Sequence, residues 1–156
     1  NACWYRDGIF TYDAVHIAIA IDTPAGLVAP VVRNADQLSL AQIAGCSRTL
    51  IEQARSGALT AQQLEGGTFT ITNLGMFEID SFTPVINLPQ AAILGVGRIV
   101  QEPVVRDGRI AIGETLSLSL TFDHRVIDGA PAARWLQRLS ETIRSPAPVL
   151  DDQAAS

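Results

Sequence analysis

The residue with the clearest chemical potential is a histidine at the end of a predicted strand. From Leu116 to Phe122, leucine or phenylalanine alternates with serine or threonine, which is typical of a strand with one buried face. His124 follows, and beyond Pro131, a natural first residue of a helix, apolar residues recur at helical spacing. A strand that ends in a turn can aim an imidazole and leave it accessible. On spacing alone, however, a lone histidine beside an arginine is more often ordinary surface chemistry than a catalytic base.

A second polar group stands on the strand predicted at 68–72. Phe69 and Ile71 face one side, so the threonines at 68, 70 and 72 face the other. The strand then runs into a glycine turn at Gly75. A row of threonines usually reflects only good strand propensity, so the residues alone favour a structural role for Thr72.

Both stretches resemble one protein family. Residues 123–130, Asp-His-Arg-Val-Ile-Asp-Gly-Ala, are similar to the Asp-His-Arg-x-x-Asp-Gly signature of the acyltransferase component of 2-oxo acid dehydrogenase complexes, relatives of chloramphenicol acetyltransferase. Residues 68–77 are similar to that family's Thr-Phe-Thr-Ile-Ser-Asn-Leu-Gly-Met-Phe, with Thr72 where serine is common, and residues 80–98 also resemble the family. The resemblance implies an α/β fold: a two-layer sandwich of the chloramphenicol acetyltransferase type, in which helices cover a mixed β-sheet.

The chemistry implied by the resemblance is acyl transfer between two thiols. His124 would be the general base that takes the proton of the coenzyme A thiol, because the thiolate is the nucleophile. The thiolate would attack an acyl-dihydrolipoyl thioester, and the Thr72 hydroxyl would donate to the oxyanion. Asp128 has two interpretations. Its residue type suits the N-cap of the following helix, whereas in the family the matching aspartate is held by an arginine from the early part of the domain and keeps the histidine loop in place.

The resemblance also orders the functional alternatives. The segments 74–77, Leu-Gly-Met-Phe, and 81–84, Ser-Phe-Thr-Pro, look like acetyl-transferring members, those of pyruvate or acetoin complexes. One alternative is a non-catalytic structural core, since some members have lost the histidine; His124, Asp128 and Thr72 argue against it. The other is a free-standing small-molecule O-acetyltransferase, and Asp123, in place of the second histidine typical there, argues against that.

Composition limits the partners and cofactors. A net charge of −5 and a pI near 4.8 argue against nucleic acid, and the short, interrupted apolar runs predict neither a membrane span nor a signal peptide. All eleven basic residues are arginine, so no lysine amine can carry a lipoyl group, which must arrive on another domain or chain. Cys3 and Cys46 form no C-x-x-C pair and no cluster with His16 or His124, which predicts no metal site and a reducing compartment. His16 itself is expected to be structural.

The predicted elements follow from local patterns. Strands are expected at 14–21 and 27–32, a helix from Ser39 to Gly57, a short helical turn after Thr60, a loop and then a buried strand at 80–98, and a hairpin that turns at Asp107-Gly108. Residues 1–12 show little periodicity beyond a turn at Asp7-Gly8. By resemblance, 1–145 form an acyltransferase catalytic domain that is incomplete at its N-terminus, and 146–156 form a flexible tail.

The resemblance finally implies assembly. Family domains form trimers and larger hollow cores, with the active site between neighbouring subunits, and they work with lipoyl domains and the other components of the complex. Both the bacterial cytoplasm and the mitochondrial matrix fit, and the cysteine usage and arginine content favour the former.

Overall fold

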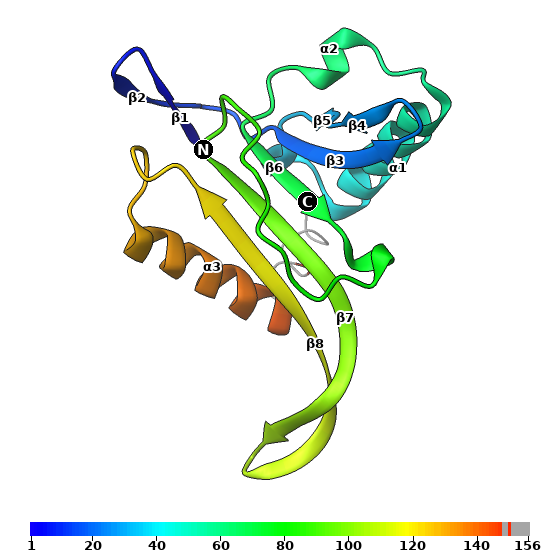
Figure 1. The fold of residues 1–156 in the computed structure, drawn as a ribbon, viewed down its shortest axis with the longest axis vertical. Helices are drawn as coiled ribbons and strands as arrows, with labels where there is room; N and C mark the ends of the chain where they lie inside the picture. The colour runs from blue at the N-terminus through cyan, green and yellow to red at the C-terminus, as the bar shows by residue number, and fades with distance from the viewer. Residues whose placement is uncertain (148–149, 151–156) are drawn as a thin grey trace.

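The computed structural model describes residues 1–147 and 150, and its centre is a mixed six-stranded sheet in the order β4-β3-β6-β7-β8, with β5 also pairing with β3 (Figure 1). The six strands are β3 (Ile17–Thr23), β4 (Gly26–Val28), β5 (Val31–Val32), β6 (Phe69–Asn73), β7 (Ala92–Arg106) and β8 (Arg109–Phe122). The three central strands β3, β6 and β7 are parallel, whereas β8 runs antiparallel to β7. The predicted mixed sheet with helices is therefore confirmed.

Two long helices pack on this sheet. Helix α1 (Leu40–Ser56) contacts β3 and β5, and α3 (Gly129–Arg144) contacts β8 (Figure 1). Helix α3 also reaches β6, because the ring centroids of Trp135 and Phe69 lie 5.5 Å apart. Within the described residues, no helix is long and apolar enough to cross a membrane.

Local signals set the limits of α1 as predicted. The Ser39 hydroxyl accepts the Gln42 N–H at 3.3 Å, and the Gln42 side chain accepts the Ser39 N–H at 2.8 Å, which completes a capping box. Gly57 ends the helix with a φ of 71°, a left-handed conformation that suits glycine. The short helix α2 (Ala61–Leu64) follows Thr60, also as expected.

Two predictions about strands need correction. The strand expected at 27–32 is split into β4 and β5 at Pro30, because proline has no N–H to donate to a ladder. Residues 1–12 form an antiparallel hairpin of β1 (Ala2–Tyr5) and β2 (Gly8–Thr11) that turns through Arg6 and Asp7 at positive φ. These strands have four residues each, too few for an alternating pattern to be recognised in the sequence.

The β7–β8 hairpin has two distinct halves. Its inner half lies in the sheet, where Ile93 and Leu94 are each only 5% exposed. The register shifts between Val96 and Ile99, and the outer half, which we call the arm (residues 99–116), curls away from the sheet (Figure 1). The arm turns at Asp107-Gly108 as predicted and exposes large apolar side chains: Ile99, Val105, Ile110 and Ile112.

Part of the sequence prediction lies beyond this description. Of the expected flexible tail at 146–156, residues 148–149 and 151–156 fall outside the described residues.

The strand predicted to end at Phe122 is present as the last part of β8. Its leucine and phenylalanine face was predicted to be buried, but it is only half-buried from Leu118 onward.

Candidate active site

His124 occupies a turn directly after the edge strand β8. The preceding Asp123 donates its N–H to the Ala91 carbonyl at 2.7 Å, and its own carbonyl accepts the N–H groups of Val126 and Ile127 at 2.9 and 3.1 Å. The His124 side chain is 71% exposed. The main chain of the turn is thus tied to the sheet while the imidazole remains open to solvent.

Asp128 has the main chain of an N-cap without the side-chain hydrogen bond of one. Its main chain has the extended conformation of an N-cap, and its carbonyl accepts the Ala132 N–H at 3.2 Å. Its side chain makes no capping hydrogen bond; instead, one carboxylate oxygen lies 3.5 Å from Nδ1 of His124. Because Gly129 is the first helical residue, α3 begins two residues before Pro131, the start that the sequence predicted.

Thr72 differs from Thr68 and Thr70, the two other threonines predicted on its face. The Thr68 hydroxyl binds the main chain of His16, and the buried Thr70 hydroxyl donates to the Gln90 side chain at 2.5 Å. The Thr72 hydroxyl is half-buried and has no hydrogen-bond partner among the described residues. Of the three hydroxyls, that of Thr72 is therefore the one that the described residues leave without a protein partner.

The sheet register separates Thr72 from His124 within one chain. Gly95 of β7 pairs with Thr72 on one side and with Ser119 of β8 on the other. His124 lies five residues beyond Ser119. The last residue of β8, Phe122, lies three residues beyond Ser119. At about 3.3 Å per residue along a strand and about 4.8 Å between strands, its backbone is roughly 14 Å from that of Thr72. The register therefore does not bring the strand position of Thr72 next to the turn that carries His124.

Comparisons with known proteins identify the family. Residues 1–150 match the family model described as 2-oxoacid dehydrogenases acyltransferase (catalytic domain). The chain belongs to this family. It is 41% identical over 150 residues to the dihydrolipoyllysine-residue acetyltransferase component of the pyruvate dehydrogenase complex of Rickettsia bellii, covering 96% of this chain and 36% of that protein.

Solved structures agree with this membership. The dihydrolipoamide acetyltransferase of Azotobacter vinelandii and the cubic core of a pyruvate dehydrogenase multienzyme complex each match with a TM-score of 0.91 and 42% identity. Each match covers 96% of this chain and 63% of the solved chain. This acyltransferase chain therefore spans about a third of the Rickettsia relative and somewhat under two thirds of the solved structures.

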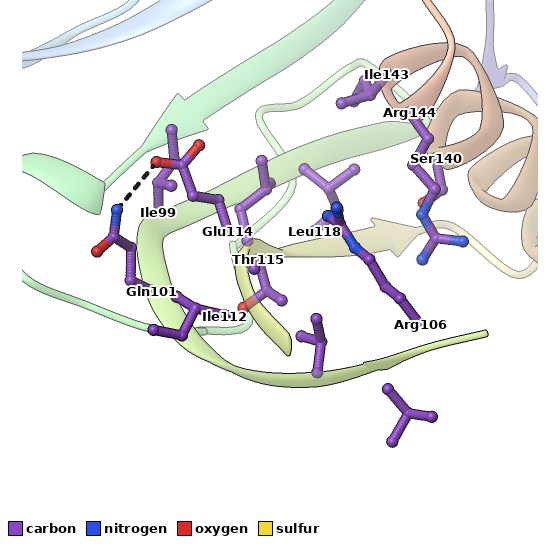
Figure 2. A pocket seen from close by; sticks show the side chains of 14 residues that line it. Ile99, Gln101, Arg106, Ile112, Glu114, Thr115, Leu118, Ser140, Ile143 and Arg144 are labelled. Atoms are coloured by element: carbon purple, nitrogen blue, oxygen red, sulfur yellow. Dashed lines mark hydrogen bonds between the residues drawn. The ribbon is translucent and has the colours of Figure 1, made fainter. Parts of the chain in front are cut away.

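A groove in this acyltransferase chain lies away from the candidate site. It has a volume of about 1030 Å³ and lies between the arm and the end of α3. Figure 2 shows Ile99 and Ile112 of the arm, Leu118 of β8, and Ile143 and Arg144 at the end of α3. Its lining includes neither Thr72 nor His124. The volume of this groove therefore does not identify the candidate site.

The remaining candidate groups have structural surroundings. Nδ1 of His16 accepts the Asn34 N–H at 3.0 Å, in line with the predicted structural role. Cys3 is buried, and its hydrogen bond with Tyr12 raises the pKa of that phenol to about 12. The part of the chain that the structure describes contains no group of three or more histidine, cysteine, aspartate or glutamate residues placed to hold a metal ion.

Sequence reasoning missed the neighbours of the histidine within the family motif. Asp123 and Arg125 form an ion pair at 2.7 Å, and the Arg125 guanidinium lies over the Trp4 ring. The Asp123 carboxylate accepts hydrogen bonds from Arg125, and these hold the pKa of Asp123 below its usual range. The sequence signal for the pair is the spacing of an acid and a base two residues apart around the histidine, which permits a local turn closed by the aspartate side chain.

Proposed function

We propose that this domain transfers an acetyl group from acetyl-dihydrolipoamide to coenzyme A within a 2-oxoacid dehydrogenase complex. His124 takes the proton from the coenzyme A thiol, and the thiolate forms a bond to the thioester carbonyl carbon. Thr72 donates a hydrogen bond to the resulting oxyanion. The intermediate then expels the dihydrolipoyl thiolate, which receives the proton from the His124 imidazolium. The reaction needs no oxidant, and the lipoyl group is carried on another domain or chain.

The observation that carries this proposal is a shared spacing. In the Azotobacter acetyltransferase, roles in the catalytic mechanism were investigated for a serine, a histidine and an asparagine. The serine precedes that histidine by 52 positions and the asparagine follows it by 4. Thr72 and Asp128 stand at the same two offsets from His124. Threonine retains the hydroxyl donor that serine has, so the oxyanion role is chemically preserved.

The free hydroxyl of Thr72 supports the same assignment. Donors that act on a transition state must be in place before charge develops and must not be consumed by the protein. Thr72 sits between Ala20 of β3 and Gly95 of β7, held by a strand on either side. Its hydroxyl is therefore both fixed in position and unused by the described residues.

The separation of roughly 14 Å between Thr72 and the end of β8, estimated from strand geometry, favours a site shared between subunits. One subunit would supply His124 and its neighbour Thr72, and we propose a trimer as the unit that closes the sites. A homologous structure is the cubic core of a pyruvate dehydrogenase complex. The exposed apolar side chains of the arm fit an oligomer that covers them.

The test combines two inactive variants. His124→Ala and Thr72→Val subunits are mixed under conditions where subunits exchange, and acetyl transfer from acetyl-dihydrolipoamide to coenzyme A is measured. Mixed oligomers should recover part of the activity, because some interfaces then pair an intact histidine with an intact threonine. Exchange without any recovery would overturn the shared site. A mixture of His124→Ala with a His124→Ala, Thr72→Val double variant is the matched control and should stay inactive.

A further inference from the structure

We propose that Asp123, Arg125 and Trp4 form a clamp that positions the His124 imidazole for catalysis. His124 lies between Asp123 and Arg125 in sequence, and the side chains of these two residues bind each other. The inference rests on the proposed function, since it concerns the same base. It assigns these three residues as positioning residues, because none of them is required to touch the reacting atoms.

The Asp123 carboxylate makes the closest contacts of the clamp. One of its oxygens accepts the Arg125 main-chain N–H at 2.9 Å, and the guanidinium binds the two oxygens with Nε at 3.0 Å and Nη2 at 2.7 Å. The fork geometry of such a pair fixes direction as well as distance. The aspartate side chain is only 16% exposed, whereas that of His124 is 71% exposed. Thus the residue before the imidazole is anchored and the imidazole itself is not.

The clamp belongs to a closed circuit of contacts between distant parts of the chain. The Asp123 N–H donates to Ala91, and the Ala91 N–H donates to the Ala2 carbonyl at 3.2 Å. Two residues after Ala2, the Trp4 ring lies 5.4 Å from the Arg125 guanidinium carbon. Arg125 in turn forms the ion pair with Asp123, so these contacts form a closed loop. A rotation of the His124 turn has to break an ion pair, a cation–π contact or a hydrogen bond to the sheet.

The imidazole has few other restraints in this structure. Its ring centroid lies 5.6 Å from that of Phe122, and the Asp128 carboxylate, 3.5 Å away, is 83% exposed. Exposed ion pairs fix geometry poorly. The Asp123 carboxylate is ionised at neutral pH, and its hydrogen bonds from Arg125 hold its pKa below the usual range. The clamp thus restrains the main chain on both sides of His124, from which the imidazole projects.

The test measures both turnover and ring position. Asp123→Ala should lower kcat by about 10- to 100-fold, the cost of a general base displaced by about 1 Å, while KM for coenzyme A changes less than about threefold. Asp123→Asn should retain much of kcat, since an amide oxygen can still accept the Arg125 N–H. Trp4→Phe should behave like the parent and Trp4→Ala should lose part of kcat. Asp36→Asn, at an exposed aspartate in the short helix η1 (Ala35–Gln37), is the matched charge control and should be unchanged.

A second readout does not depend on activity. In a Trp135→Phe background, Trp4 is the single tryptophan, because the chain has two. Asp123→Ala should then shift its emission to longer wavelength as Arg125 leaves the ring, and the NMR signals of the His124 imidazole should move. If His124→Ala abolishes turnover but Asp123→Ala leaves kcat and the imidazole signals unchanged, the clamp is overturned and the proposed function stands. If His124→Ala is fully active, the proposed function fails, and the imidazole signals of the Asp123 variants still decide whether the clamp fixes the ring.

Discussion

The two halves of the candidate site are held in opposite ways. Thr72 lies on β6 within the sheet, between Ala20 of β3 and Gly95 of β7. His124 lies on a turn beyond the edge strand and is mostly exposed. The sheet therefore fixes Thr72, the proposed oxyanion donor, within the single chain, whereas His124, the proposed base, depends on local turn contacts. The position of Thr72 is set by strand pairing in the sheet, whereas the position of His124 is set by contacts in its turn.

This difference has a physical consequence for catalysis. A hydrogen bond to a developing oxyanion is most effective where water is excluded and the donor does not reorganise. A general base must instead reach its proton within hydrogen-bond distance in the complex with substrate. An exposed imidazole in the free chain is compatible with that requirement, because substrate and, in the proposed trimer, a neighbouring subunit would cover it.

The largest effect on turnover is expected from substitution of the exposed His124. His124→Ala should lower kcat by about two to four orders of magnitude, the usual contribution of a general base, with little change in coenzyme A binding. Steady-state kinetics together with calorimetric binding of coenzyme A would measure both. The control is His16→Ala, which removes the acceptor of the Asn34 N–H and should cost about 1 kcal/mol of stability without lowering the kcat of the folded protein. Near-normal turnover of folded His124→Ala would remove the mechanism.

Replacement of Thr72 and of Thr70 by valine distinguishes the proposed oxyanion donor from a threonine that only stabilises the fold. Thr72→Val should lose about 2 to 4 kcal/mol of transition-state stabilisation and keep the fold, while Thr72→Ser should retain activity. Thr70→Val should leave kcat intact but lower the free energy of unfolding by about 1 to 3 kcal/mol, because it leaves the buried Gln90 side chain without its donor. Kinetics and denaturant unfolding of the two valine variants should give opposite results. Equal activities of Thr72→Val and Thr72→Ser would make Thr72 structural.

The sequence predicted those features whose determinants are local. The limits of α1 follow from Ser39, Gln42 and Gly57, and the arm turn follows from Asp107 and Gly108, so neighbouring residues decided each one. The roles assigned to His124 and Thr72 came from the resemblance of whole motifs to a family, since spacing alone favoured surface or structural roles.

What the sequence did not reveal depends on residues that meet only in the fold. Trp4 and Arg125 are brought together by β1 and the β8 turn, which are at opposite ends of the chain. The distinction between Thr70 and Thr72 requires knowing that Gln90 reaches only the former. Patterns of period two place threonines on a face, but they do not say which hydroxyl has a partner.

A smaller effect, on the free energy of unfolding, is expected from substitution of Gly97. A Cβ on Gly97 of β7 would overlap the main-chain carbonyl of Asp80, and backbone cannot give way as a flexible side chain can. Gly97→Ala should therefore destabilise the fold by about 1 to 3 kcal/mol, the typical cost of overpacking, as thermal unfolding would measure. Gly129→Ala is the control, since a Cβ there meets nothing within 4 Å at the start of α3. A Gly97→Ala variant as stable as Gly129→Ala would show that the loop at Asp80 moves aside freely.

The smallest effect is expected at Asp128, and it tests how exposed the histidine half is in the working protein. With both side chains mostly exposed, the pair with His124 is worth at most about 1 kcal/mol, so Asp128→Asn should lower kcat by less than about fivefold. An asparagine stands at the same offset in the Azotobacter acetyltransferase, which fits a tolerated amide. A loss of several hundredfold would contradict this prediction. It would mean that the assembled protein buries the pair, because only a desolvated carboxylate contributes that much to holding an imidazole.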